Sequence, residues 1–121
     1  MATRLTAFSD GIVQIFRQKD RKTGFNARLN PTGLEDLEFV VKLAFDEASK
    51  RQQDLEFAEQ SGFQLSYKVR TRWVPFVETK MKAVIDDTLY DISYVDKSGR
   101  EMYLYLESVR KLEVSDDASG D

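Results

Sequence analysis

Between Phe63 and Arg72 the sequence alternates strictly between apolar and polar residues, and this pattern constrains the fold more than any other. The apolar set is Phe63, Leu65, Tyr67, Val69 and Thr71, and the polar set is Gln64, Ser66, Lys68, Arg70 and Arg72. Side chains in a β-strand point alternately to opposite faces, so the pattern predicts one buried and one solvated face. The apolar face must be covered, so the chain must build a sheet over a core.

Five further segments are rich in β-branched and aromatic residues and predict strands at 11–18, 37–45, 79–85, 89–95 and 101–109. Asp86 and Asp87 predict one turn, and the segment 96–99, which ends in glycine, predicts another. The last three strands then form a meander, with Tyr90, Ile92 and Tyr94 expected on one face of the fifth strand.

A helix is predicted over 49–60, where straight-chain residues dominate and β-branched residues are absent. Ser49 is the expected N-cap, with Gln52 completing a capping-box pattern, and Gly62 is the expected C-cap. Leu55 and Phe57 cannot both face one core, so the helix is expected to contact two surfaces. Both residues are therefore candidate interface residues.

Six strands and one short helix predict a mostly β fold, a small antiparallel β-barrel, because closing the sheet removes its exposed edges. The helix is inserted between strands two and three. A single domain is expected over 1–112, with a long mobile basic loop at 19–33 after strand one. Residues 113–121 carry four acids and no base, and predict an acidic disordered tail.

Composition argues against catalysis. The chain has no cysteine and no histidine, which excludes thiolate chemistry and the commonest general base. The acids Asp86, Asp87 and Asp91 lack the spacing of a calcium loop and indicate a turn, and no phosphate loop or nucleophile motif is found. We therefore expect no enzyme, no catalytic residue, no cofactor and no metal. Without a signal peptide or a run of roughly 20 apolar residues, we also expect a soluble chain with no membrane partner.

Basic residues mark two candidate contact regions. In the loop, Lys19, Arg21, Lys22 and Arg28 are candidates for contact with DNA phosphates or an acidic partner, and a solvated loop is the alternative. On the polar side of the alternating strand, Arg70 and Arg72 are candidate interface residues. With Lys68, and with Lys80 and Lys82 opposite, they would form a basic stripe; an ordinary charged sheet surface is the alternative.

The segment 73–77 is an apolar run broken by Pro75, which favours a bend or an exposed loop over a central strand. Trp73 and Phe76 are candidate interface anchors, because tryptophan is enriched at the energetic centres of interfaces. The alternative is that this loop plugs one end of the barrel.

Tyrosines offer a different class of function. Tyr90, Tyr94, Tyr103 and Tyr105 suit base stacking on a single-stranded nucleic acid. Packing within the sheet is the favoured interpretation. Net charge is −3, and without the four tail acids the body is close to neutral, unlike most dedicated nucleic-acid binders.

The order of these elements resembles the head-closure proteins (stoppers, or head–tail adaptors) of long-tailed bacteriophages. The resemblance covers roughly residues 8–112 and rests on order, since each motif is degenerate. The resemblance is based on four segments: Ser49 with Gln52 and Gln53, the segment 67–72, the hairpin 84–92 and the strand 99–106.

The resemblance implies a virion protein that assembles in the host cytoplasm. Its subunits would form a homo-oligomeric ring below the portal or adaptor ring, retain packaged double-stranded DNA and receive the tail proteins. The loop 19–33 would project into the channel. Alternatives are a neighbouring tail-completion or tail-terminator protein, a single-stranded nucleic-acid-binding barrel, and an enzyme with a carboxylate-bound metal.

Overall fold

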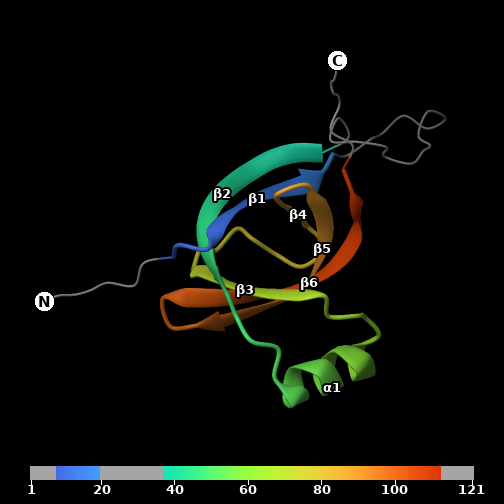
Figure 1. Cartoon of the computed structure of the whole chain (residues 1–121). Coiled ribbons are helices and arrows are strands. Elements are labelled where there is room, and N and C mark those ends of the chain that lie inside the picture. The colour runs from blue at the N-terminus through green and yellow to red at the C-terminus, as the bar shows by residue number, and fades with distance from the viewer. Residues whose placement is uncertain (1–7, 20–36, 113–121) are drawn as a thin grey trace, which may run out of the picture.

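The computed structural model describes residues 8–19 and 37–112 (Figure 1). They form six strands and one helix, in the order β1 (Gly11–Gln18), β2 (Leu37–Glu47), α1 (Gln52–Ser61), β3 (Tyr67–Arg72), β4 (Lys82–Ile85), β5 (Thr88–Ser98) and β6 (Glu101–Lys111). Every strand pairing is antiparallel. The predicted mostly β fold with six antiparallel strands and one helix is confirmed. Strands β3 and β4 begin at residues 67 and 82, later than the predicted 63 and 79.

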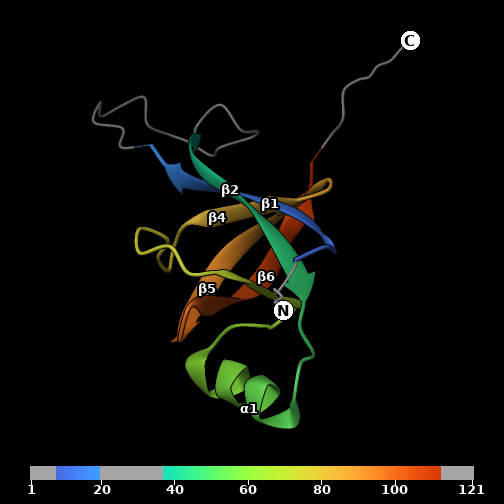
Figure 2. The same ribbon diagram turned by 90° about the vertical axis from the view of Figure 1, so that its left-hand side faces the viewer.

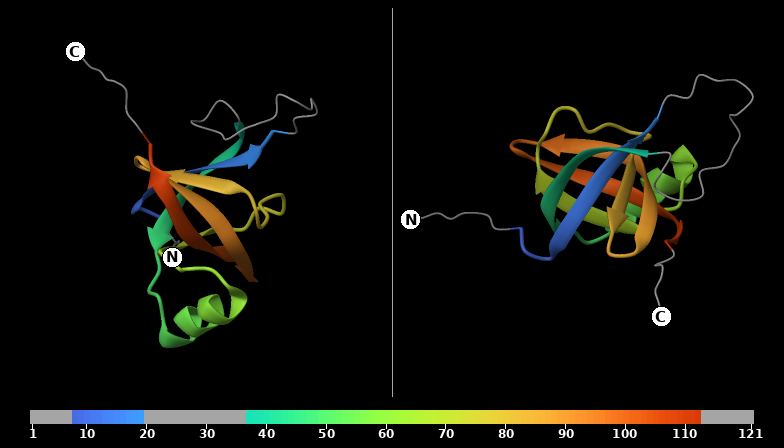
Figure 3. Two further views of the ribbon diagram at one scale, coloured as in Figure 1. Left: turned by 90° about the vertical axis from the view of Figure 1, so that its right-hand side faces the viewer. Right: turned by 90° about the horizontal axis from the view of Figure 1, so that it is seen from above.

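Hydrogen bonding closes the strands into a ring, with the order β1-β2-β3-β6-β5-β4 and the topology of a closed barrel. Closure occurs where β4 pairs with β1, Ile85 lying opposite Val13. Seen from above in Figure 3, β1 runs between β2 and β4. The helix lies outside the ring (Figure 1).

Inside the ring lies one continuous apolar core. Its most deeply buried side chains include Val13, Ile15, Phe45, Val69, Ile92, Met102, Leu104 and Leu106. The chain between β3 and β4 passes across the ring in Figure 1 and contributes Val74 and Val77, which are 5% and 4% exposed. This loop therefore closes part of the core with its valines, as the plug alternative predicted.

Strand β5 differs from its predicted face pattern. A β-bulge between Ile92 and Tyr94 shifts the register with β6. Ile92 is 1% exposed inside the barrel, whereas Tyr94 is 38% exposed and lies opposite Tyr105. The prediction that Tyr90, Ile92 and Tyr94 share a face is wrong, because a bulge adds one residue and reverses the alternation after it.

The basic stripe is also contradicted. Strand β3 pairs with β2 and β6, whereas β4 pairs with β1 and β5, so Lys80 and Lys82 do not lie opposite the bases of β3. Lys68, predicted to be solvated, is only 4% exposed.

Within the 63–72 alternation, Tyr67 and Val69 pack on the barrel core, whereas Phe63 and Leu65 precede β3 and pack beside Ala58 of α1. The prediction that the whole apolar set shares one buried face is therefore wrong, because the strand begins only at residue 67.

Both ends of α1 are set by local geometry. The N-cap is Arg51 and not Ser49, and the Arg51 backbone N–H donates to the Asp54 carboxylate at 2.9 Å. Gly62 ends the helix as predicted, with φ of 86° in the left-handed region. Its N–H donates to the Glu59 carbonyl.

Replacing Gly62 with alanine is expected to lower the free energy of unfolding by about 1–2 kcal/mol, because a Cβ is strained at this φ. Urea denaturation of the full chain measures the change. Ser61→Ala, one residue earlier in helical backbone, is the control and is expected to shift stability by less than about 0.5 kcal/mol. Equal stability of both variants would contradict the assigned cap.

The remaining turns follow expectation. Asp86 has φ of 56° between β4 and β5, and Gly99 has φ of 67° between the paired residues Ser98 and Glu101. The mobile loop predicted at 19–33 lies outside the described residues beyond Lys19, as does the predicted tail at 113–121. Among the described residues, no helix is long and apolar enough to cross a membrane.

Candidate interaction surface

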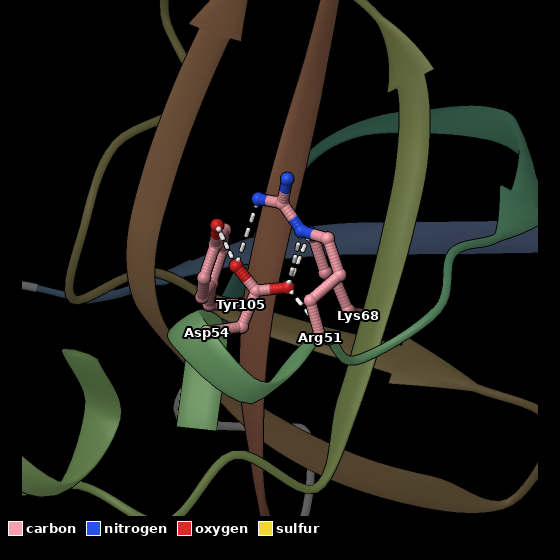
Figure 4. Close-up of polar contacts among 4 residues, drawn as sticks. All are labelled: Arg51, Asp54, Lys68 and Tyr105. Atoms are coloured by element: carbon pink, nitrogen blue, oxygen red, sulfur yellow. Dashed lines mark hydrogen bonds and ion pairs between the residues drawn. The ribbon is translucent and has the colours of Figure 1, made fainter. Parts of the chain in front are cut away.

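A buried polar cluster joins α1 to the outside of the barrel (Figure 4). The Asp54 carboxylate accepts hydrogen bonds from Lys68 at 2.8 Å, from the Tyr105 hydroxyl at 3.1 Å and from the Arg51 guanidinium at 3.1 and 3.2 Å. Asp54, Lys68 and Tyr105 are each less than 5% exposed. They come from α1, β3 and β6, so the cluster fixes the helix against these two strands.

The electrostatics of the cluster follow from its hydrogen bonds. Burial acts to raise the pKa of Asp54, but hydrogen bonds from Arg51, Lys68 and Tyr105 outweigh it and hold that pKa well below its usual range. Burial, and then donation to Asp54, raise the pKa of Tyr105 to about 12. Asp54 is therefore ionised and Tyr105 neutral at neutral pH.

An aromatic cluster continues this contact. The Phe57 ring lies 4.8 Å from Tyr94, 6.0 Å from Tyr105 and 6.1 Å from Phe63, measured between ring centroids. Phe57 is thus packed against the protein itself, whereas Leu55 is 41% exposed. The helix packs on the barrel through its Phe57 side, whereas Leu55 points mainly to solvent. The predicted second contact of the helix stays a prediction.

The pKa of Tyr105 gives a test of the cluster. Because the phenol ionises with a pKa of about 12 when folded and near 10 when unfolded, it stabilises the fold below pH 10, and this contribution is lost as the pH rises through 12. When tyrosinate absorbance is followed against pH, the step near pH 12 is expected to be absent from the Tyr105→Phe variant. Tyr103→Phe is the control, and loss of the same step in that variant would contradict the assignment.

Beside the cluster lies a polar groove of about 860 Å³. Its lining residues are Asp10, Asp46, Glu47, Ala48, Ser49, Arg51, Lys68, Arg70, Asp96, Lys97, Ser98 and Tyr103. They come from the residue before β1, the end of β2, the segment joining β2 to α1, β3 and the β5–β6 hairpin. The groove thus brings acids and bases together in equal number.

Arg70 lies in this groove and is paired within the chain. Its guanidinium donates to Asp46 and Glu101, each at 2.8 Å, and stacks 4.7 Å from the Phe8 ring centroid. A backbone N–H of Ser9 and the Arg70 guanidinium lower the pKa of Asp46 against the opposing effect of burial. Arg70 therefore holds β3 to β2 and β6 as well as lining the groove.

The other predicted interface residues are spread over the surface. Arg72 is exposed at the end of β3, and Phe76 is 48% exposed in the β3–β4 loop. Trp73 is half-buried, with the Lys97 ammonium 5.3 Å from its ring centroid. Lys19 is exposed just after β1, and the three remaining loop bases lie outside the described residues: Arg21, Lys22 and Arg28.

The four tyrosines do not share one face. Tyr90 packs against Tyr67 beside the core, Tyr105 is buried under α1, and Tyr103 is half-buried with the Lys68 ammonium 5.0 Å from its ring centroid. Only Tyr94 is more than one-third exposed. A row of rings open to successive bases is therefore not assembled from these side chains.

The candidate acids are also apart. Asp91 pairs with Lys82, and Asp87 lies 3.5 Å from the Lys111 ammonium. Within residues 8–19 and 37–112, no group of three or more acids is placed to hold a metal ion.

The sequence analysis did not single out Asp54 and placed Lys68 in a solvated basic stripe, yet these are the two most buried charges among residues 8–19 and 37–112. Arg51 and Asp54 have the i,i+3 spacing of a helix-terminal pair, which is the available signal for half of the cluster. Nothing in the sequence brings Lys68 to Asp54, because the contact depends on where α1 docks.

Comparison with known proteins adds no family. Neither the models of known protein families nor the curated proteins contain a match to this chain.

Proposed function

We propose that this chain is a structural subunit of the head–tail junction of a long-tailed bacteriophage. Its copies would form a ring below the portal or adaptor that retains packaged DNA and offers the attachment surface for the tail. The proposal rests on the order of sequence motifs between residues 8 and 112. A small closed sheet with one helix inserted after β2 is the architecture that the resemblance implies.

Exposed apolar side chains support a binding role. Phe39, Phe76 and Leu55 are 53%, 48% and 41% exposed and come from β2, the β3–β4 loop and α1. Contiguous apolar patches mark interaction sites, whereas apolar side chains scattered singly are normal on a protein surface, so these three residues are individual candidate contacts. Phe76 and Leu55 are therefore our candidate contacts with the neighbouring ring or the tail, with Trp73 and Arg72 close to Phe76 in the chain.

In this proposal the basic segment after β1 lies nearest the DNA. Lys19, Arg21, Lys22 and Arg28 would lower the electrostatic cost of confining phosphates in the channel. Its action is mechanical: the segment narrows the path until the tail is attached. The arrangement of tyrosines favours this function over a single-strand-binding barrel, which needs stacked, accessible rings.

The test is the solution mass of the purified full chain, alone and mixed with the portal-side ring proteins encoded beside it. Co-migration with the portal ring, with a stoichiometry that matches its symmetry, is expected. Binding only to a tail tube would support the tail-completion alternative. Salt-sensitive binding to short oligonucleotides, without portal binding, would overturn the proposal in favour of the nucleic-acid barrel.

A further inference from the structure

Several strands of the ring extend beyond a pairing partner, and the two longest unpaired stretches among the described residues belong to β2 and β5. Strand β2 pairs with β1 from residue 37 to 45, but with β3 only from 45 to 47. Strand β5 pairs with β6 along most of its length, but on its other side β4 and the residues before it bond no further than Ile92. Among the described residues, 37–43 of β2 and 93–98 of β5 each have one backbone edge without a partner.

Such edges are sites of strand pairing. Each presents N–H and C=O groups that another strand can satisfy, which is why proteins usually cover or charge them. The two edges have similar lengths and belong to different parts of the barrel. In Figure 2 the tip of the β5–β6 hairpin lies on the α1 side of the barrel, whereas β2 begins at the opposite end.

The charges on the two edges are complementary. On β2, Glu38 is paired with Arg17 at 3.4 Å, whereas Lys42 has no ion-pair partner among the described residues. On β5, Lys97 donates to the Gly99 carbonyl, whereas Asp96 has no such partner in the same part of the chain. Considering residues 8–19 and 37–112 alone, one edge therefore carries a cation and the other an anion that is not in an ion pair.

Both charges lie on the outer face of the barrel. Lys42 is opposite the exposed residue Gln14 of β1. Asp96 is opposite Tyr103 of β6, and both line the polar groove. If the two strands paired with the outer faces of both barrels on the same side of the joint sheet, these side chains would project from the same face.

We propose that β2 of one copy pairs with β5 of the next copy, with Lys42 facing Asp96 of that copy. The inference rests on the proposed ring function and assigns its subunit contact. Because the two edges differ, the contact is head to tail, and repetition produces a ring if the rotation closes.

One strand pairing of this length buries far less than the roughly 1,200–2,000 Å² of a stable interface. The contact is therefore expected to be weak for the free chain and to strengthen when copies dock on a shared template.

Disulfide trapping tests the contact, because the chain has no natural cysteine. The full-length variant carrying both Lys42→Cys and Asp96→Cys, concentrated in oxidised glutathione, is expected to give a ladder of disulfide-linked multimers on a non-reducing gel. Each single variant can link at most two chains. Asp87→Cys with Glu59→Cys, both exposed and outside the two edges, is the matched control and is expected to give no ladder.

A charge exchange tests the pairing itself. Lys42→Glu is expected to weaken self-association roughly five- to tenfold by sedimentation of the concentrated chain, since repulsion replaces attraction. Adding Asp96→Lys is expected to restore it. Recovery would not occur if Lys42 acted only within its own chain.

The outcomes separate this inference from the proposed function. Absence of a ladder from the double-cysteine variant, alone and on the portal ring, overturns the edge contact even if the chain binds the portal. A ladder without portal binding supports the contact and overturns the junction function.

Discussion

Replacing Asp54 with alanine is expected to lower the free energy of unfolding by about 3–5 kcal/mol, because Lys68 would remain buried without a counter-charge. Asp54 and Lys68 are 3% and 4% exposed and lie 2.8 Å apart. The Tyr105 hydroxyl would also lose its acceptor. The helix is expected to detach from β3 and β6, since these contacts hold its buried side.

Urea denaturation measures the loss, and hydrogen exchange of residues 52–61 reports whether the helix is released. Asp91→Ala is the matched control, since Asp91 also pairs with a lysine of a neighbouring strand but is 41% exposed, and a change of no more than about 1 kcal/mol is expected. Similar losses of stability in both variants would show that burial does not determine how much the Asp54–Lys68 ion pair contributes to the free energy of unfolding.

Replacing both charged residues by apolar ones separates two effects on the free energy of unfolding. One is the cost of leaving a buried charge unpaired, and the other is the stabilisation by the ion pair. Asp54→Leu with Lys68→Met is expected to recover most of the stability that Asp54→Ala loses, because no charge is then left without a partner. A double variant as unstable as Asp54→Ala would show instead that the hydrogen bonds themselves hold the helix.

Replacing Phe45 with alanine is expected to cost about 3–5 kcal/mol, the range for deleting a buried aromatic ring. Phe45 is 2% exposed and packs edge-on against Tyr67, with ring centroids 6.1 Å apart. Its ring also fills the space beside Gly11, where an added Cβ would lie 3.0 Å from a ring carbon. The residue thus joins β1, β2 and β3 within the core.

Phe39→Ala is the control, because Phe39 is on the same strand and 53% exposed. A change of less than about 1 kcal/mol is expected for it. Thermal or urea unfolding of the full chains measures both. A Phe45 variant that unfolds like the control would contradict its place in the core.

Local pattern predicted much of the fold. Strand β1 has its predicted bounds, and β6 (Glu101–Lys111) contains the whole strand predicted at 101–109. Gly62 ended the helix and Gly99 formed the hairpin turn, since both need a positive φ that glycine adopts freely. These features depend on neighbouring residues, so the sequence carries them directly.

The residues of the candidate site were harder to predict from the sequence than the strands. Trp73, Phe76 and Leu55 were chosen by residue type, and only Phe76 and Leu55 are largely exposed. Arg70 was expected to meet a partner, but two acids within the chain already pair with it. Partner charges far apart in sequence cannot be assigned before strand order is known.

A β-rich chain with one inserted helix could be predicted from local properties, because side-chain periodicity and capping residues depend on near neighbours in the sequence. The return of β4 to β1, the burial of Lys68 under α1 and the bulge that turns Tyr94 outward became visible only in the folded barrel. The open edges of β2 and β5 also appear only once the ring has closed. Each of these features depends on which distant segments of the chain meet. Strand pairing and packing across the barrel decide which side chains are buried and which charges find a partner.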